Sequence, residues 1–346
     1  MRKVKKVKIG KDVQLGDGKV YIQSMLSVPA NNIEGNVAQA LQLEKAGCQI
    51  IRFAIPSMKD IQLIPHIKER VKIPLVADIH FDFRLALAAI DAGIDKIRIN
   101  PGNIGSEDRI KLVADKCKQN NIPIRIGVNS GSLEKHILAK YGQVTAEALT
   151  ESAFYHVNLL EKYDFNDIVV SIKSSNVKMM IDAYRLFALK CNYPLHLGVT
   201  EAGTKHMGII KSAVGIGSLL CDGIGETIRV SLTDDPVEEI YAAKDILKAI
   251  GKGSGPEIVS CPTCGRTQIS LINLAKQVEK RAKSLDKNIK IAVMGCVVNG
   301  PGEAREADIG IAGGKGEGLI FKKGKIIKKV PENQLLDELF IEIENL

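Results

Sequence analysis

The sequence predicts an α/β fold, with an N-terminal TIM-type (β/α)8 barrel followed by a smaller α+β domain. Short apolar runs alternate with amphipathic helical patterns eight times before residue 250. Many of the turns between them are short, and parallel strands joined by right-handed helical crossovers suggest a closed barrel. A glycine-rich stretch at 251–256 is typical of a flexible linker. We therefore expect a barrel domain over 1–252 and a second domain over 256–346.

Each expected strand of the barrel is followed by an expected helix. Glycines at 47 and 93 directly follow helical patterns, where they end a helix well. An open doubly wound sheet is the alternative, but no Gly-x-Gly-x-x-Gly follows the first strand, which weakens a dinucleotide-binding fold. The strand and helix pairs are 20–24 and 33–46, 50–56 and 59–71, 74–79 and 83–92, 96–101 and 106–119, 123–129 and 146–162, 167–173 and 177–189, 194–199 and 205–220, and 225–232 and 236–249.

The second domain mixes strands and helices without the βα alternation. A polar amphipathic pattern near 269–283 predicts a helix, and a last helix is expected from about residue 332. Short apolar runs predict strands at 290–294, 308–311, 319–321 and 326–330, with a turn at 322–325.

Composition favours an ordinary globular protein that acts on a small anion. Of 346 residues, 25% are charged and 45% hydrophobic, and the net charge is +8. Aromatic residues make up only 4% with no tryptophan, so stacking platforms for nucleic acid are scarce. The basic start lacks a following apolar region, and no apolar run reaches the ~18 residues of a membrane span. Together with seven unevenly spaced cysteines, this predicts a cytoplasmic protein without disulfides, nucleic acid or membrane partners.

Basic side chains lie inside the expected strands, where barrel interiors normally hold branched apolar residues. In the fourth strand, Lys96, Arg98 and Asn100 share one face, and isoleucines share the other. Because the apolar face must meet the helices, the basic face points into the barrel or its mouth. The cations with this placement are Arg52, Arg98, Arg125, Lys173 and Arg229.

These cations would repel one another in a barrel unless anionic groups lie among them. Asp78, Glu201 and Glu226 are the carboxylates available to pair with them, which is fewer than the five cations. Arginine's planar fork suits phosphate oxygens, and lysine adds a point charge. We therefore expect a phosphorylated, multiply charged substrate.

Further polar residues stand where the expected strands end. Asp78 and His80 close the third strand, Asn129 closes the fifth, and Thr200 and Glu201 follow the seventh. Any one of them alone is more often a structural hydrogen-bonding group. Their shared place at the carboxyl ends of the strands, where barrel enzymes do their chemistry, makes them candidate site residues.

Three cysteines and a carboxylate in the second domain form a candidate metal site. Cys261 and Cys264 are two residues apart, Cys296 ends an apolar run, and Glu303 follows in a Gly- and Pro-rich loop. Structural zinc wants four Cys or His ligands. Three thiolates can instead hold three irons of a 4Fe–4S cluster and leave the fourth for an oxygen ligand. From spacing alone, the cluster, half of a zinc site and a redox dithiol all stay open.

The combination of motifs resembles the 4-hydroxy-3-methylbut-2-enyl diphosphate synthase family of the non-mevalonate isoprenoid pathway, in its short bacterial form. The resemblance covers essentially the whole chain and is highly specific. In order, the matching motifs are Ala77-Asp-Ile-His-Phe81, Arg98-Ile-Asn-Pro-Gly-Asn-Ile-Gly105, Arg125-Ile-Gly-Val-Asn129, Gly131-Ser-Leu-Glu134, Gly198-Val-Thr-Glu-Ala-Gly203, Arg229-Val-Ser231, Cys261-Pro-Thr-Cys264 and Gly295-Cys-Val-Val-Asn-Gly-Pro-Gly-Glu-Ala304.

The resemblance implies an oxidoreductase that opens and dehydrates 2-C-methyl-D-erythritol 2,4-cyclodiphosphate to 4-hydroxy-3-methylbut-2-enyl diphosphate with two external electrons. It implies a 4Fe–4S cluster held by Cys261, Cys264, Cys296 and Glu303. The implied diphosphate contacts are Arg52, Arg98, Arg125, Asn129, Lys173, Arg229 and Ser231. Asp78, His80, Thr200 and Glu201 would surround the reacting carbons, with Glu201 as the general acid.

The resemblance also implies partners. Flavodoxin or ferredoxin would supply the electrons, and a homodimer would let the cluster domain of one chain cap the barrel of the other. One departure is Phe53-Ala54 after Arg52, where other members more often carry Val-Ser or Val-Thr. The loss of a small hydroxyl there could slightly alter the phosphate contacts.

Two readings from other classes remain. Lys173 ends the sixth strand, where Schiff-base aldolases of this fold place their lysine, and the cysteines would then hold structural zinc. A metal-stabilised module that binds nucleic acid through its basic termini would instead bind RNA or DNA tightly and in a salt-sensitive way.

Overall fold

The computed structural model describes residues 2–296 and 306–346. The chain divides into two compact units, Met1–Lys252 and Gly253–Leu346, and each is treated by itself. The division falls inside the glycine-rich stretch at 251–256.

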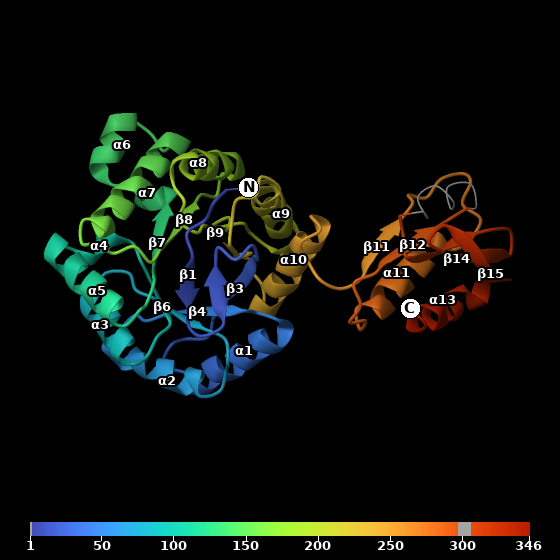
Figure 1. Cartoon of the computed structure of the whole chain (residues 1–346), viewed down its shortest axis with the longest axis horizontal. Helices are drawn as coiled ribbons and strands as arrows, with labels where there is room; N and C mark the ends of the chain where they lie inside the picture. Colours follow the sequence, from blue (N-terminus) through green and yellow to red (C-terminus); the bar gives the residue numbers. More distant parts are fainter. Residues whose placement is uncertain (1, 297–305) are drawn as a thin grey trace. The chain divides into compact units, whose positions relative to one another are not determined.

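The first unit is a nearly closed parallel barrel with its helices outside (Figure 1). Its strands follow one another around the sheet in the order β8-β7-β6-β5-β4-β3-β10-β9. A parallel bridge between Val170 and Leu195 joins the two ends of this order. The strands are β3 (Tyr21–Met25), β4 (Ile50–Ala54), β5 (Leu75–Asp78), β6 (Lys96–Ile99), β7 (Ile124–Asn129), β8 (Ile168–Lys173), β9 (His196–Leu197) and β10 (Thr227–Ile228).

The helices pack on the outward-facing apolar residues of these strands. Helix α1 shows how sequence sets their ends: the Asn32 side chain accepts from the Gly35 N–H, and Gly47 ends the helix at φ +96°. The helical segments are α1 (Ile33–Ala46), η1 (Met58–Gln62), α2 (Leu63–Lys68), α3 (Phe83–Asp91), α4 (Pro101–Ile104), α5 (Glu107–Gln119), η2 (Ser130–Ser132), α6 (Lys135–Tyr141), α7 (Ala146–Glu161), α8 (Val177–Lys190), α9 (Lys205–Cys221) and α10 (Pro236–Ala249).

An N-terminal hairpin packs on the amino ends of the strands. Strands β1 (Val7–Ile9) and β2 (Val13–Leu15) pair antiparallel. Their apolar side chains form one buried cluster with Tyr21, Ile50 and Val169, which lie at or near the starts of β3, β4 and β8. The hairpin therefore closes the end of the barrel opposite the carboxyl ends of the strands.

The second unit is a five-stranded mixed sheet with two longer helices, α11 (Leu271–Ala282) and α13 (Leu335–Glu344), which contribute to its core. The sheet order is β11-β12-β13-β14-β15, parallel over the first three strands and antiparallel over the last two pairs. The remaining segments are β11 (Glu257–Ser260), β12 (Lys290–Met294), β13 (Ile309–Gly313), β14 (Glu317–Lys322), β15 (Lys325–Pro331) and η3 (Glu332–Gln334).

The eight expected strand–helix units are present, and the predicted fold class is confirmed. The helix expected over 59–71 is split into η1 and α2, because Pro65 has no N–H to bond the carbonyl of Ile61. Strands β9 and β10 span two residues each, fewer than expected. The β1–β2 hairpin, α6 and β11 were not expected from the sequence. No helix among residues 2–296 and 306–346 is long and apolar enough to cross a membrane.

Candidate active site

Asp78, at the carboxyl end of β5, joins three of the predicted site residues. Its side chain is 1% exposed. Arg52 Nη2 donates to Asp78 Oδ2 at 2.6 Å, and Arg98 Nη1 donates to Oδ1 at 3.0 Å. His80 Nε2 lies 3.2 Å from the same Oδ2. One buried carboxylate therefore orients two guanidinium groups and an imidazole from three consecutive βα units.

The charges around Asp78 keep it ionised. Burial opposes ionisation, but the charges of Arg52 and Arg98 and the hydrogen bond from His80 hold the pKa of Asp78 well below its ordinary value. Asp78 is thus an acceptor at neutral pH and has no proton to donate. This geometry favours an orienting role for Asp78 over direct proton transfer.

Arg229 has a partner that the sequence reasoning missed. Glu239, in the first turn of α10, is 3% exposed and accepts from Arg229 Nη2 at 3.1 Å and from Nε at 3.3 Å. From the sequence, only the barrel carboxylates Asp78, Glu201 and Glu226 were expected to be available as partners of the strand cations. A signal was present, because Glu239 occupies a core-facing position of α10 beside Ile240 and Ala243.

Of these three available carboxylates, Glu201 and Glu226 make no ion pair with the strand cations among the described residues. Glu226 is buried and lies 3.8 Å from Arg2 Nη1, and it accepts from the Leu195 N–H at 2.6 Å, so it serves the N-terminal segment. Glu201 is exposed and makes no ion pair with a described residue. Asp78 and Glu239 are the two carboxylates that do pair with the strand cations.

Three further cations lie in the barrel without such a partner. Lys96 and Arg125 are fully buried, and the Lys96 Nζ and the Arg125 Nη1 have no hydrogen-bond partner among the described residues. Lys173 is 8% exposed and makes no ion pair within the described chain. Burial lowers the pKa of Lys173 well below its ordinary value, and nearby positive charges lower it further, those of Arg125, Arg229, Arg52 and Arg98. Six cations thus share this region with two carboxylates, which leaves a marked excess of positive charge.

Two glycines make room for these cations. A Cβ added at Gly127 on β7 would lie 2.5 Å from Arg98 Nε and 2.6 Å from its Nη2. A Cβ at Gly198 would lie 2.7 Å from the Arg229 carbonyl oxygen and 3.1 Å from Lys173 Nζ. The guanidinium of Arg98 can cross the interior only because β7 carries no side chain at that point.

The remaining predicted residues lie around the carboxyl ends of the strands. Asn129, Thr200 and Ser231 are half-buried, and the His80 side chain is 52% exposed. Glu201 is exposed at φ +51°, a left-handed conformation that non-glycine residues seldom adopt. Such backbone outliers gather at functional sites, which supports Glu201 as a candidate.

The second unit brings three predicted cysteines to one cavity. The cavity has a volume of about 90 Å³ and is lined by Cys261, Pro262, Cys264, Arg266, Thr267, Gly295 and Cys296. Cys261 and Cys264 follow β11, and Cys296 follows β12, two neighbouring parallel strands that end at the same edge. Glu303, the fourth predicted ligand, lies outside the described residues.

Hydrogen bonds reach two of these sulfurs, and they favour the thiolate of Cys264. The Gly295 N–H donates to Cys261 Sγ at 3.2 Å. A backbone hydrogen bond at Arg266, followed by one from the Thr267 hydroxyl, lowers the pKa of Cys264. All seven cysteines are free, and within 2–296 and 306–346 no three His, Cys, Asp or Glu side chains converge as ligands of one metal ion. The donor set fits a thiolate-held centre whose cysteines bind separate metal atoms.

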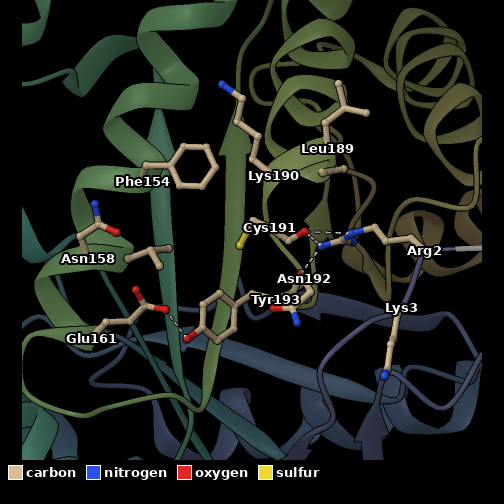
Figure 2. A pocket seen from close by; sticks show the side chains of 12 residues that line it. Arg2, Lys3, Phe154, Asn158, Glu161, Leu189, Lys190, Cys191, Asn192 and Tyr193 are labelled. Carbon is tan, nitrogen blue, oxygen red and sulfur yellow. Dashed lines mark hydrogen bonds between the residues drawn. The ribbon is translucent and has the colours of Figure 1, made fainter.

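A larger cavity lies on the outside of the barrel and holds none of the predicted residues. Its volume is about 570 Å³, and it lies between α7, α8 and the N-terminal segment (Figure 2). Arg2 there donates to the carbonyl oxygens of Cys191 and Tyr193 at 3.0 and 2.5 Å, and the Tyr193 hydroxyl donates to Glu161 at 2.7 Å. Its polar groups thus hold the N-terminus against α8, and we assign the chemistry to the barrel interior.

The fold and the site define a barrel enzyme for a multiply charged anion, followed in the sequence by a cysteine-bearing α+β domain. Two family descriptions match the chain in sequence order. The GcpE TIM-barrel domain matches residues 4–244, and the GcpE protein C-terminal domain matches residues 257–345. The chain belongs to the GcpE family, and the resemblance inferred from its motifs is confirmed.

Full-length relatives agree with this assignment. Proteins named 4-hydroxy-3-methylbut-2-en-1-yl diphosphate synthase (flavodoxin) from Clostridium acetobutylicum and Clostridium perfringens are each 61% identical to the chain. The first match covers 99% of this chain and 98% of the relative, and the second covers 100% and 99%. A relative of the same name from Fusobacterium nucleatum is 61% identical and covers 97% of this chain and 94% of its own.

Solved structures of more distant proteins share the barrel. A dihydropteroate synthase from Coxiella burnetii superposes with a TM-score of 0.52 at 12% identity, covering 71% of this chain and 98% of its own. One from Yersinia pestis gives 0.51 at 14% identity, covering 72% and 99%. At these identities the likeness concerns the fold alone.

Proposed function

We propose that this chain forms the product named in its relatives, 4-hydroxy-3-methylbut-2-enyl diphosphate. The reaction implied by the family resemblance is reductive ring opening and dehydration of 2-C-methyl-D-erythritol 2,4-cyclodiphosphate. Two observations carry the proposal: the excess of cations in the barrel interior, and the three clustered cysteines of the second unit. A cyclic diphosphate supplies the negative charges that the interior lacks. Thiolates supply the ligands of a redox centre.

The barrel residues bind and orient the substrate. Arg52 and Arg98 are held by Asp78, and Arg229 is held by Glu239, so three guanidinium groups are fixed before substrate arrives. Fixed guanidinium forks match phosphate oxygens with little loss of side-chain freedom. We propose that Lys173, Arg125, Asn129 and Ser231 complete the diphosphate contacts.

The cysteines would hold a 4Fe–4S cluster. We propose Cys261, Cys264 and Cys296 as its thiolate ligands and Glu303 as its fourth ligand, with flavodoxin as the electron donor. When bound, the cluster would supply single electrons and a Lewis-acidic iron for an oxygen of the substrate.

Proton delivery is assigned to the mouth of the barrel. We propose Glu201 as the general acid for the departing hydroxyl, because it lies at the carboxyl end of the barrel in a left-handed backbone conformation that is typical of functional sites. Thr200, beside it, and His80, oriented by Asp78, would contact the carbon skeleton.

Metal content tests the proposal directly. Anaerobically purified wild-type chain should contain about four irons and no zinc, and the ligand change Cys296→Ser should remove most of them. Glu303→Ala should keep the iron and lose the reductive activity. A Cys221→Ser variant, at an exposed cysteine outside the cavity, serves as the control. One zinc per chain without iron, even after anaerobic reconstitution, would refute the reductase.

A Schiff-base aldolase is the second candidate, favoured by one observation. Lys173 is buried at the end of β8, and its pKa is lowered, as expected for an amine nucleophile. Borohydride in the presence of a sugar phosphate would then trap a covalent adduct on Lys173. Absence of trapping, together with bound iron, leaves the reductase as the function.

A further inference from the structure

The carboxylate of Glu239 accepts four hydrogen bonds from three residues and has almost no contact with solvent. Besides the two bonds from Arg229, its Oε2 accepts from the Ser24 hydroxyl at 2.8 Å and its Oε1 accepts from the Leu232 N–H at 3.1 Å. Ser24 lies on β3, Leu232 lies on the loop after β10, and Glu239 itself lies in the first turn of α10. Three elements that surround the end of the barrel's last βα unit therefore meet at one carboxylate.

These contacts fix the plane of the Arg229 guanidinium. Glu239 takes Nε and Nη2, which form one edge of the fork. The remaining nitrogen, Nη1, has only the Met25 Sδ at 3.7 Å as a partner among the described residues, and a thioether is a weak acceptor. The Arg229 side chain is 18% exposed, whereas that of Glu239 is 3% exposed.

The placement also explains why an acid stands in a helix face that otherwise packs on the core. Its neighbours on that face, Ile240, Ala243 and Ile246, are apolar and buried. A buried carboxylate in such a face is costly unless it is paired and hydrogen-bonded. The first turn of a helix stabilises negative charge, which reduces that cost. If position 239 served only to pack on the core, an apolar residue would be expected there.

We propose that Glu239 is a positioning residue for anion binding: it holds Arg229 so that Nη1 stays free for a phosphate oxygen of the substrate. The identity of that substrate rests on the proposed function, but the anion-binding role does not. Glu239 contacts no reacting atom in this scheme and acts through Arg229 alone.

A double-mutant cycle on anion binding tests this. The probes are inorganic diphosphate and the cyclic diphosphate, titrated calorimetrically into full-length wild type, Glu239→Gln, Arg229→Met and the double variant. Glu239→Gln keeps the size of the side chain and is expected to weaken diphosphate binding about tenfold, the size of a typical coupling between contacting residues. In the Arg229→Met background, the same change should have no further effect on affinity.

The matched control is Glu238→Gln, on the same turn of α10. Its carboxylate pairs at the surface with Lys205 at 2.7 Å and should leave affinity unchanged. Thermal unfolding of each variant separates positioning from folding. The inference would be refuted if the Glu239→Gln variant unfolded at a lower temperature but bound both probes with wild-type affinity. It would also be refuted if Glu239→Gln lowered the affinity equally in the wild-type and the Arg229→Met chains.

The outcomes also separate this inference from the proposed function. If the protein binds inorganic diphosphate through the Arg229–Glu239 pair but does not reduce the cyclic diphosphate, the inference is supported and the proposed function is refuted. If the protein turns over the cyclic diphosphate and the KM of Glu239→Gln equals that of wild type, the inference is refuted and the proposed function is retained.

Discussion

Asp78 shows how one buried side chain sets the arrangement of its neighbours. Its two oxygens take one hydrogen bond each from Arg52 and Arg98, so the two guanidinium groups are held near one carboxylate. Without it, two buried cations would face each other and the other positive charges of the interior. The electrostatic balance of the site therefore depends on this residue more than on any single cation.

Replacement of Asp78 by asparagine is expected to destabilise the fold and weaken substrate binding. Loss of one partner from a buried ion pair leaves uncompensated charge, at a cost of about 3 kcal/mol. Because the pKa of Asp78 is held below its ordinary value, its stabilising contribution is complete above about pH 4 and disappears as the pH falls through the folded-state pKa. Thermal melts of wild type and Asp78→Asn should therefore differ at neutral pH and converge in acid.

The control for this experiment is Asp91→Asn. Asp91 is 67% exposed and pairs with Lys116 at 2.5 Å, and such surface pairs contribute about 0–1 kcal/mol. If Asp78→Asn were no less stable than Asp91→Asn at neutral pH, the orienting role of Asp78 would be wrong.

Much of the site could be predicted from single residues, for a physical reason. Cations at alternate positions of apolar strands can only face the barrel interior. The two-residue alternation of β-strands alone therefore predicted that Arg98 and Arg125 lie inside the barrel, where both are buried. Their partners could not be derived in this way, since pairing depends on which helix turn lies over which strand end. Glu239 was missed because it belongs to a helix. Glu226 was named as an available partner, but it lies near Arg2 instead of the strand cations.

At the scale of elements, local signals determine where helices begin and end, and interior contacts determine where strands end. The bounds of α1 and α10 follow their caps, Asn32 and Asp235, and were predictable to the residue. Strands β9 and β10 are shorter than their apolar runs, since Gly198 and Arg229 approach each other closely just beyond them. The hairpin β1–β2 was missed because its strands span only three residues each, too few to show a clear apolar alternation.

Gly127 tests the fit between neighbouring strands. The change Gly127→Ala would place a methyl group 2.5 Å from Arg98 Nε, so the guanidinium must shift away from Asp78. We expect diphosphate affinity to fall about tenfold, as for the loss of one coupled contact, while the barrel stays folded. Titration calorimetry with inorganic diphosphate measures this.

The control substitution is Gly217→Ala in α9, where the added methyl group meets no atom within 4 Å. Helix propensity predicts that this variant is as stable as wild type or slightly more so. If Gly127→Ala bound inorganic diphosphate with wild-type affinity, the observed position of the Arg98 guanidinium would not be required for diphosphate binding.

At the scale of the whole molecule, the substrate residues and the cysteines belong to different units of the chain. The candidate substrate residues lie at the carboxyl ends of the barrel strands, whereas α10 runs back from that face and ends at Ala249, just before the second unit begins. A barrel can therefore work either with the cysteines of its own chain or with those of a partner chain. The homodimer implied by the family resemblance, with one chain's cluster domain serving the partner's barrel, stays a prediction.

Mixing two inactive variants decides between these arrangements. Lys173→Met removes a cation of the substrate site that has no ion pair among the described residues, so the chain should still fold, and Cys296→Ser removes a ligand of the proposed cluster. If sites are shared between two chains, the equimolar mixture should recover about a quarter of wild-type activity, because about half of the dimers are mixed and each has one complete site. Each variant alone should stay inactive, and a mixture of Lys173→Met with Arg98→Met, both changed in the barrel, should recover nothing. No recovery in the first mixture, in samples that sedimentation shows to exchange subunits, would mean that each barrel uses the cysteines of its own chain.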